Sequence, residues 1–459
     1  MNFNGKRITI MGLGSLGGGV GAATFLAEQG ARLLITDLRS GNDLKESLQK
    51  TAKYSNITYV FGEHREQDFL EADMVVKNPA VRFDSPYLAK ARNAGIPIET
   101  DISIFLKMSP APVIGVTGTK GKSTTSALVH AFLNTSYPTF LGSVAGVSPF
   151  DFYNKLTSSH LVVLELSSFE LQDLAPHQIS PHGAVVTNVF PDHLNYHKNF
   201  EEYLEAKKGI FKFQKSEDFA VFNFGNDYSR SFADEAPARV RFFNNGEDAK
   251  APLRNLFQES NLRGESSVAE AMKGEHNKEN VLAALCVARL YGVPLKRIRD
   301  VLSEWKGIPY RQQLVAKVGE VLFYNDTTAT IPQATIAALR TIPSPLILLA
   351  GGLDKELDYR LLGEEIRTRD VSLVVLFPGS ASVKINEALV AAGYSGERIK
   401  EAQSMEEAIR IAFHQAKPGY SIVLSPAATS FNLFKNEFDR GEQFNNAVKA
   451  LLKNVKMED

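Results

Sequence analysis

Residues 115–126 read Gly-Val-Thr-Gly-Thr-Lys-Gly-Lys-Ser-Thr-Thr-Ser. The apolar segment 112–116 predicts a short buried strand before this stretch, and the segment 123–133 predicts a helix after it. Glycines between a strand and a helix let backbone N–H groups approach an anion at the helix N-terminus. The stretch therefore predicts a phosphate-binding loop of the short Thr-Gly-Thr-Lys-Gly-Lys-Ser form, since Val116 stands where the full Walker pattern has glycine.

ATP chemistry is the first hypothesis for this loop. Lys122 is expected to reach the β- and γ-phosphates, and Ser123 to bind Mg²⁺. A glycine-rich turn that only allows a helix to pack on a strand is the alternative. The loop residues expected to contact the nucleotide are Gly118, Thr119, Lys120, Gly121, Lys122, Ser123 and Thr124.

The composition describes a large and nearly neutral chain. Its 459 residues exceed one ordinary domain, and its formal net charge of −1 gives no sign of a surface for nucleic acid or anionic membrane. The single cysteine, Cys286, lies in an apolar helical pattern and leaves no disulfide within the monomer. No signal peptide or membrane-length apolar run is apparent, so we expect a cytoplasmic protein. We also expect a monomer.

A second glycine loop, Gly12-Leu-Gly-Ser-Leu-Gly17, follows a predicted strand at 7–11. The next predicted strand, 33–36, ends at Asp37, which is the spacing of a Rossmann-type dinucleotide fingerprint. This pattern indicates an anion shaped like a diphosphate. It does not distinguish NAD from another ligand that carries a ribose and a diphosphate.

Strand and helix signals alternate along the whole chain and predict an α/β protein with three domains. We expect an N-terminal Rossmann-like domain at 1–102 and a central P-loop ATPase-like domain with a parallel sheet at 103–307. A C-terminal Rossmann-like domain is expected at 308–459.

Polar residues at strand ends mark a crevice in the central domain. Glu165 ends an apolar strand and is the first candidate Mg²⁺ ligand, with a solvated acid as the alternative. Asp192 and His193 follow another strand, so that Asp192 orients His193 or His193 coordinates a cation. The sequence physics alone assigns Lys207 to a solvated helix face and His197 to a polar loop.

The C-terminal domain shows three such strand ends, which we expect to face one crevice. Arg311, just past the predicted boundary, either reaches back to phosphates or has a structural role. The three polar turns span residues 325–330, 351–355 and 425–430.

With these motifs assembled, essentially the whole chain resembles the Mur ligases, and the glutamate-adding members more than the diaminopimelate- or lysine-adding ones. The strings that carry the resemblance include GLGSLG, TGTKGKST, LELSSFEL, TNVFPDHLNYH, YLEAKK, EHNKENVLAA, PYRQQ, NDTTAT, AGGLDK and SPAATSFNLFKNEFDRG. The resemblance implies an ATP-dependent amide ligase of peptidoglycan precursor synthesis. In such a ligase ATP phosphorylates the carboxylate of UDP-N-acetylmuramoyl-L-alanine, and the amine of D-glutamate attacks the acyl phosphate.

The resemblance also assigns site residues. It implies catalytic roles for Lys122, His193 and Lys207, and nucleotide contacts beyond the loop from Asn277, Arg311 and Asp326, with His276 and Asn280 in support. The implied Mg²⁺ ligands are Ser123, Glu165, His193 and Lys207, the last as a carbamate. UDP is expected at Ser15, Leu16, Asp37 and Arg39, and glutamate at Thr330, Lys355 and Ser430.

The sequence departs from the family pattern at several positions. Thr328 replaces a usual lysine, Tyr310 a usual histidine, Glu437 an expected aromatic residue, and 142–146 reads Gly-Ser-Val-Ala-Gly instead of Gly-Asn-Ile-Gly. An acceptor other than D-glutamate therefore stays an alternative. A noncatalytic nucleotide-binding homologue and an NAD-dependent oxidoreductase are others, but the oxidoreductase leaves the second phosphate loop unexplained.

Overall fold

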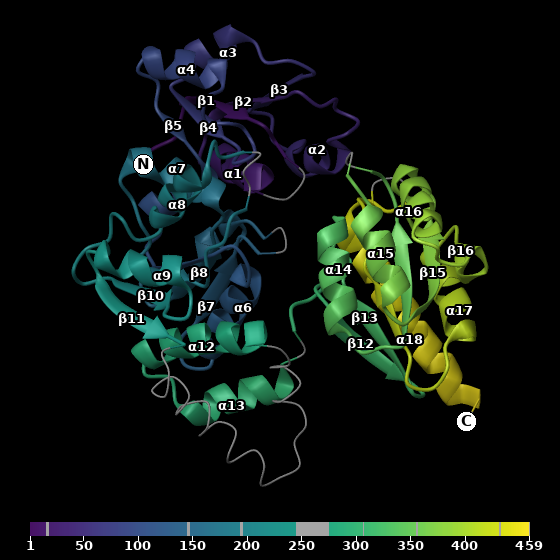
Figure 1. Cartoon of the computed structure of the whole chain (residues 1–459). Coiled ribbons are helices and arrows are strands. Elements are labelled where there is room, and N and C mark those ends of the chain that lie inside the picture. The colour runs from purple at the N-terminus through teal and green to yellow at the C-terminus, as the bar shows by residue number, and fades with distance from the viewer. Residues whose placement is uncertain are drawn as a thin grey trace. The chain divides into compact units, whose positions relative to one another are not determined.

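A computed structural model of the chain shows three β-sheets with helices packed on them (Figure 1). Two compact units, Met1–Glu304 and Trp305–Asp459, divide the chain, and the first unit contains two of the sheets. The predicted α/β class is confirmed. The described residues are 1–14, 18–144, 147–192, 196–244, 275–305, 307–354, 357–430 and 433–458.

The first sheet has five parallel strands in the order β3-β2-β1-β4-β5. Its strands are β1 (Arg7–Met11), β2 (Arg32–Asp37), β3 (Ile57–Phe61), β4 (Met74–Lys77) and β5 (Ile98–Glu99). Its helices are α1 (Gly18–Glu28), α2 (Lys45–Thr51), α3 (Glu66–Leu70), α4 (Pro86–Asn93) and α5 (Asp101–Met108). The strand order reverses beside β1, so the crevice at the carboxyl edge of this sheet lies at the first glycine loop.

The second sheet has six parallel strands in the order β11-β10-β9-β6-β8-β7. Its strands are β6 (Val113–Thr117), β7 (Thr139–Gly142), β8 (Leu161–Glu165), β9 (Gly183–Val186), β10 (Phe219–Asn223) and β11 (Arg239–Phe243). Its helices are α6 (Lys122–Leu133), α7 (Ser168–Leu174), α8 (Phe200–Lys208), α9 (Asp227–Ser231), α12 (Glu275–Leu290) and α13 (Leu295–Glu304), and a short 3₁₀ helix, η1, spans Pro149–Asp151. Every residue of the central strand β6 is buried, which explains its uninterrupted apolar run.

The first two sheets share one apolar core. The ring of Phe25 from α1 stacks on that of Phe150 from η1 at 4.4 Å between centroids, and Phe105 from α5 meets Phe150 edge-on at 5.9 Å. A buried ion pair adds to this contact, because Lys77 Nζ at the end of β4 lies 2.6 Å from Asp173 Oδ2 in α7. These contacts hold the two sheets in a single compact unit.

The third sheet, in the second unit, has the order β12-β13-β17-β14-β15-β16. Its strands are parallel except β12, which pairs with β13 in the antiparallel sense. They are β12 (Gln313–Val318), β13 (Val321–Asn325), β14 (Leu346–Gly351), β15 (Val371–Phe377), β16 (Ile399–Glu401) and β17 (Ser421–Leu424). The helices are α14 (Pro332–Thr341), α15 (Arg360–Thr368), α16 (Ser380–Ala391), α17 (Met405–Gln415) and α18 (Glu437–Glu458).

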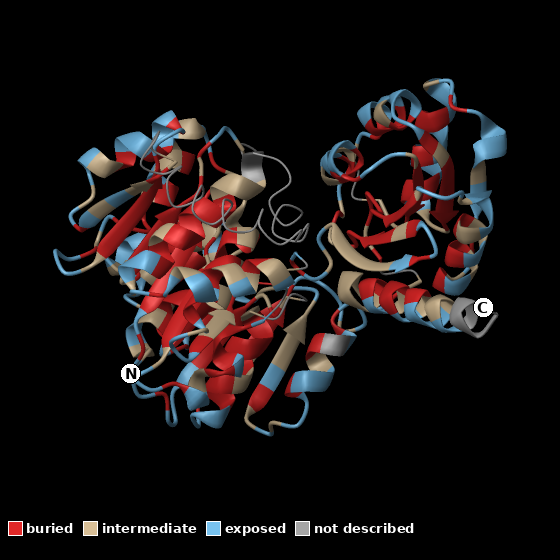
Figure 2. Ribbon diagram, turned by 90° about the horizontal axis from the view of Figure 1, so that it is seen from below, coloured by how far each residue is buried: buried red, intermediate tan, exposed pale blue. Residues whose placement is uncertain are grey.

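Burial follows this layering in both units. Figure 2 shows that the strands are mostly buried, while the helices combine buried residues with exposed ones. None of the helices in the described part of the chain has the length and apolar character of a membrane span.

Candidate functional site

The predicted strand–loop–helix at 112–133 is confirmed as β6, a loop and α6. The loop turns on Gly118 and Gly121, whose φ angles are 150° and 83°. Gly121 is the N-cap of α6, and a Cβ atom there would lie 2.2 Å from Oδ1 of Asn280. A larger residue at this position would therefore be strained and would clash. The N-terminus of α6 suits an anion such as a phosphate, because the first N–H groups of a helix have no acceptor within the helix.

Residues after β9 hold this loop in place. The backbone N–H of Thr119 donates to the carbonyl of Asn188 at 2.9 Å, and that of Lys120 donates to Asn188 Oδ1 at 2.9 Å. The Thr187 hydroxyl donates to the carbonyl of Lys120 at 2.6 Å. These hydrogen bonds fix the shape of the loop, which reduces the ordering cost of ligand binding.

Two lysine amines converge on the loop. Nζ of Lys122 donates to the carbonyls of Gly118 and Thr119 at 3.1 and 3.2 Å, and Nζ of Lys207 donates to the same Gly118 carbonyl at 3.0 Å. Lys207 is 1% exposed, so its assignment to a solvated helix face is wrong. Burial and the nearby charge of Lys122 hold the pKa of Lys207 well below its ordinary value, against the opposing effect of Asp192.

Oxygen ligands suited to Mg²⁺ lie around the same loop. Glu165 ends β8 and is in register with Val116 of β6, while Ser123 lies buried in the first turn of α6. Within the described residues, no group of three or more His, Cys, Asp or Glu side chains is arranged to hold a metal. A hydroxyl and a carboxylate nevertheless fit Mg²⁺, which completes its shell with phosphate oxygens and waters. His193 lies outside the described residues.

Further residues of the central domain line the interior near the loop. His197 lies in the loop before α8, as predicted, but it is 1% exposed, with Nε2 3.0 Å from the Ser168 hydroxyl and its ring stacked on Phe169. Asn280 is buried and accepts a hydrogen bond from the Thr125 hydroxyl at 3.2 Å. Asn277 lies half-buried one turn earlier in α12, and the side chain of His276 lies outside the described set.

In the first sheet, Asp37 and Arg39 lie beside the other glycine loop. Asp37 Oδ2 accepts from the backbone N–H of Leu13 at 3.1 Å and from Arg39 Nη2 at 2.9 Å. Burial alone would raise the pKa of Asp37, but the hydrogen bonds and charge of Arg39 outweigh it and lower that pKa. Ser15 and Leu16 lie outside the described residues.

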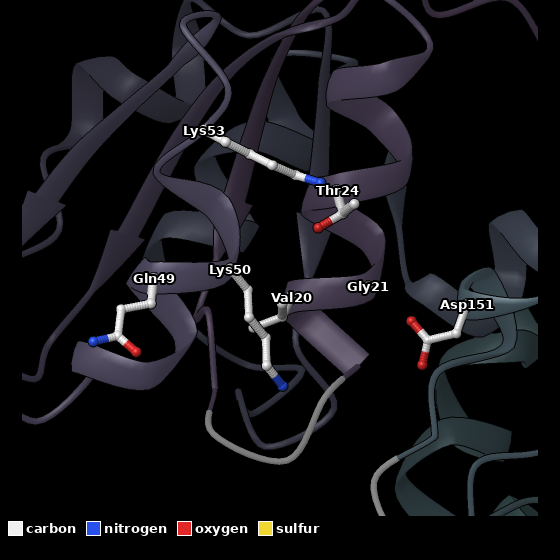
Figure 3. Close-up of a pocket in the computed structure, with 7 residues that line it drawn as sticks. All are labelled: Val20, Gly21, Thr24, Gln49, Lys50, Lys53 and Asp151. Atoms are coloured by element: carbon white, nitrogen blue, oxygen red, sulfur yellow. The ribbon is translucent and has the colours of Figure 1, made fainter.

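A pocket of about 370 Å³ adjoins α1 and α2 (Figure 3). Its lining includes none of the residues predicted for the site. Those that line it are Val20, Gly21, Thr24, Gln49, Lys50, Lys53 and Asp151.

The three predicted turns of the C-terminal sheet do meet, because β13, β17 and β14 are adjacent strands. A hydrogen bond of 2.8 Å runs from the N–H of Ala427 to the carbonyl of Ala329, and Leu353 bridges Thr429. Asp326 lies buried at this edge and accepts from the Ser425 hydroxyl at 2.8 Å. Burial raises the pKa of Asp326 to about 7 despite this bond.

The remaining predicted residues of this unit lie on the same turns or next to them. Thr330 is half-buried, and Arg311 is exposed. Ser430 is 1% exposed, and its hydroxyl has no hydrogen-bond partner within the described ranges. Lys355 lies outside those ranges.

Sequence reasoning missed Arg440. This arginine of α18 is fully buried and donates from Nε to the Thr327 hydroxyl at 2.9 Å and from Nη2 to the Thr327 carbonyl at 2.8 Å. Nη1 donates to the carbonyl of Ala428 at 3.2 Å. The sequence feature that could have indicated its burial is its helical spacing from the apolar residues Phe444 and Val448, which place it on one face of the helix with them.

The chain matches domain models of one family in three successive segments. They are "Mur ligase MurD-like, N-terminal domain" over residues 6–100, "Mur ligase middle domain" over 116–288 and "Mur ligase, glutamate ligase domain" over 310–428. A UDP-N-acetylmuramoylalanine–D-glutamate ligase from Roseiflexus sp. is 40% identical, over 98% of this chain and 100% of that one. This chain belongs to the Mur ligase family.

This Mur ligase has further relatives and structural neighbours of the same family. A UDP-N-acetylmuramoylalanine–D-glutamate ligase of Borreliella afzelii is 37% identical over 96% of this chain and 97% of its own. The crystal structure of MurC from Thermotoga maritima matches with a TM-score of 0.59 at 18% identity, covering 97% of this chain and 99% of that one. MurF from the same organism, in complex with ADP, matches with a TM-score of 0.52 at 17% identity, covering 99% and 96%. These two structures share the fold of this Mur ligase.

Proposed function

We propose that this Mur ligase is an ATP-dependent amide ligase that adds D-glutamate to UDP-N-acetylmuramoyl-L-alanine in peptidoglycan precursor synthesis. The relatives named as D-glutamate ligases align over nearly the whole chain and support this substrate pair. The structural observation that carries the proposal is the pair of lysine amines, Lys122 and Lys207, at one carbonyl of a glycine loop. Such a loop suits the activation of a carboxylate by ATP.

The residues of the loop act mainly on charge. Transfer of a phosphoryl group to a carboxylate brings two anions together, and fixed positive charges and N–H dipoles reduce their repulsion. We assign Lys122 to the β- and γ-phosphates, and Gly118, Thr119, Lys120, Gly121, Ser123 and Thr124 to the rest of the triphosphate. His193 is assigned a catalytic role and a metal contact.

Lys207 is proposed to carry a carbamate. Its lowered pKa leaves a neutral amine, whose nitrogen lone pair forms a bond to the carbon of CO₂ and releases one proton. The product is a carboxylate-like group beside the loop. Ser123, Glu165, His193 and this carbamate would hold Mg²⁺, which when bound neutralises phosphate charge.

The other ligands are assigned by position. Asn277, Arg311 and Asp326 are proposed for the nucleotide, with Asn280 in support. UDP is assigned to Ser15, Leu16, Asp37 and Arg39, and the acceptor glutamate to Thr330, Lys355 and Ser430. We further propose a cytoplasmic monomer with functional domains at 1–102, 103–307 and 308–459, which binds neither nucleic acid nor membrane.

The test is phosphate release from Mg-ATP with UDP-N-acetylmuramoyl-L-alanine, in the presence of D-glutamate, L-glutamate or no amino acid. We expect turnover that depends on D-glutamate, and a product whose mass is that of the glutamyl amide. Turnover with another acceptor alone would keep the ligase and change its substrate. Absence of turnover with every acceptor would favour a noncatalytic nucleotide-binding protein.

A further inference from the structure

Arg440 joins the two turns that carry proposed acceptor ligands. Its guanidinium bonds to Thr327, three residues before Thr330, and to Ala428, two residues before Ser430. Thr327 also donates from its hydroxyl to the carbonyl of Glu437 at 2.8 Å. The first turn of α18 therefore fixes the ends of β13 and β17 relative to each other.

The positive charge of Arg440 is not neutralised within the described residues. All three of its partner atoms are carbonyl or hydroxyl oxygens, and no carboxylate pairs with it there. Complete burial without an ion pair is costly, and it lowers the pKa of Arg440 to about 9. A buried cation of this kind projects a positive potential into the turns that surround it.

Glu437 acts against that potential. It is half-buried, precedes Arg440 by three positions in α18 and exerts an opposing charge effect on the guanidinium. A change of the Glu437 side chain therefore alters the positive potential at the turns. It leaves every hydrogen bond of Arg440 in place. Thr327 bonds to the backbone carbonyl of Glu437, so the side-chain charge is removable without loss of that bond.

We propose that Arg440 is a positioning residue of the acceptor site, which holds the β13 and β17 turns together and supplies the positive potential that favours a dicarboxylic amino acid. This inference rests on the proposed function, because it concerns how the acceptor of that reaction is bound. It assigns the preference for an acidic acceptor to a charge behind the site as well as to the side chains on the two turns.

The test measures KM for D-glutamate, KM for UDP-N-acetylmuramoyl-L-alanine and kcat for the full chain and three variants. Arg440→Met removes the charge and is expected to raise KM for D-glutamate about tenfold or more. Arg440→Lys keeps the charge and should recover part of that loss. Glu437→Gln removes the opposing charge and is expected to lower KM for D-glutamate about threefold. KM for the UDP substrate should stay unchanged in Arg440→Lys and Glu437→Gln.

Glu437→Gln keeps the proposal testable if Arg440→Met does not fold. The Glu437 side chain makes none of the hydrogen bonds described above that join the two turns. Glu406→Gln, at an exposed acid in the first turn of α17, is the matched control and should leave KM for D-glutamate unchanged. If Glu437→Gln leaves that KM at the wild-type value, or shifts both KM values alike, the electrostatic role is wrong. If the wild-type chain itself shows no turnover with D-glutamate, the proposed function fails instead.

Discussion

Lys207 occupies a place where an ammonium group is costly. Its side chain is buried and faces the charge of Lys122, so its neutral form is favoured at lower pH than in a free lysine. A group with a lowered folded pKa loses its proton as pH rises through that value. The proposed carbamate requires the neutral amine, and its yield should therefore rise with pH over the same range.

Lys207→Arg tests this chemistry at one residue. Arginine keeps the positive charge but forms no carbamate, so we expect kcat to fall about 100-fold or more. Wild-type protein in ¹³C-labelled bicarbonate should show a carbamate signal by ¹³C NMR that grows as pH rises and is absent from the variant. Lys212→Arg, at an exposed lysine nearby, should keep both the signal and the rate. Wild-type activity in Lys207→Arg would contradict the assignment.

Single residues also show where sequence reasoning stops. The glycine loop was predictable because strand, turn and helix are local features, whereas burial of Lys207 and His197 depends on packing between α8, α7 and the loop. A lysine in a helix is solvated far more often than buried, so residue type alone predicts an exposed Lys207, whereas the side chain is buried. For Lys207, only the family resemblance pointed to the site. The burial of Arg440 was not predicted for the same reason, because arginine is also far more often solvated than buried.

Among the elements, strand β4 and helix α7 are joined by the buried pair of Lys77 and Asp173. Burial raises the pKa of Asp173 to about 6 even though Lys77 lowers it. Removal of the lysine would leave a buried acid without its ion-pair partner, which costs more than the pair contributes. This contact between the first two sheets thus depends on both partners.

Lys77→Met should therefore lower the free energy of unfolding of this unit by about 3–5 kcal/mol, measured by urea denaturation followed with circular dichroism. The double variant Lys77→Met/Asp173→Leu should recover most of the loss, since it removes both members of the ion pair. Arg82→Met is the control. It breaks an exposed ion pair with Asp84 and should leave the midpoint of the urea transition unchanged. A double variant no more stable than Lys77→Met would show that the unpaired charge is not the cause.

Strands differed in how far sequence predicted them. The central strands, such as β6, β8 and β14, are buried on both faces and read as apolar runs. The strands missed by the pattern include β3 and β11, which lie at sheet edges and are partly exposed, and also β10, which is an inner strand buried throughout. Alternation over five residues resembles an irregular segment, which accounts for the two edge strands. It does not account for β10.

On the scale of the whole molecule, the proposed ligands of one reaction come from both compact units. Lys122 and Asp37 belong to Met1–Glu304, whereas Thr330 and Ser430 belong to Trp305–Asp459. The amine of the acceptor has to reach the acyl phosphate, so we predict that ligand binding brings the two units together. The order of motifs along the chain predicts this division of the ligands, and the expectation of closure comes from the chemistry of the transfer.

Small-angle X-ray scattering tests that closure directly. Addition of a nonhydrolysable ATP analogue with Mg²⁺ and UDP-N-acetylmuramoyl-L-alanine should decrease the radius of gyration of the chain. The reason is that the nucleotide is proposed to contact Lys122 in one unit and Arg311 and Asp326 in the other. Lys122→Met, which removes the amine assigned to the β- and γ-phosphates, should show a smaller decrease at the same ligand concentrations. Scattering curves that superimpose with and without saturating ligands would mean that these ligands do not bring the units together. The predicted domain closure would then be wrong.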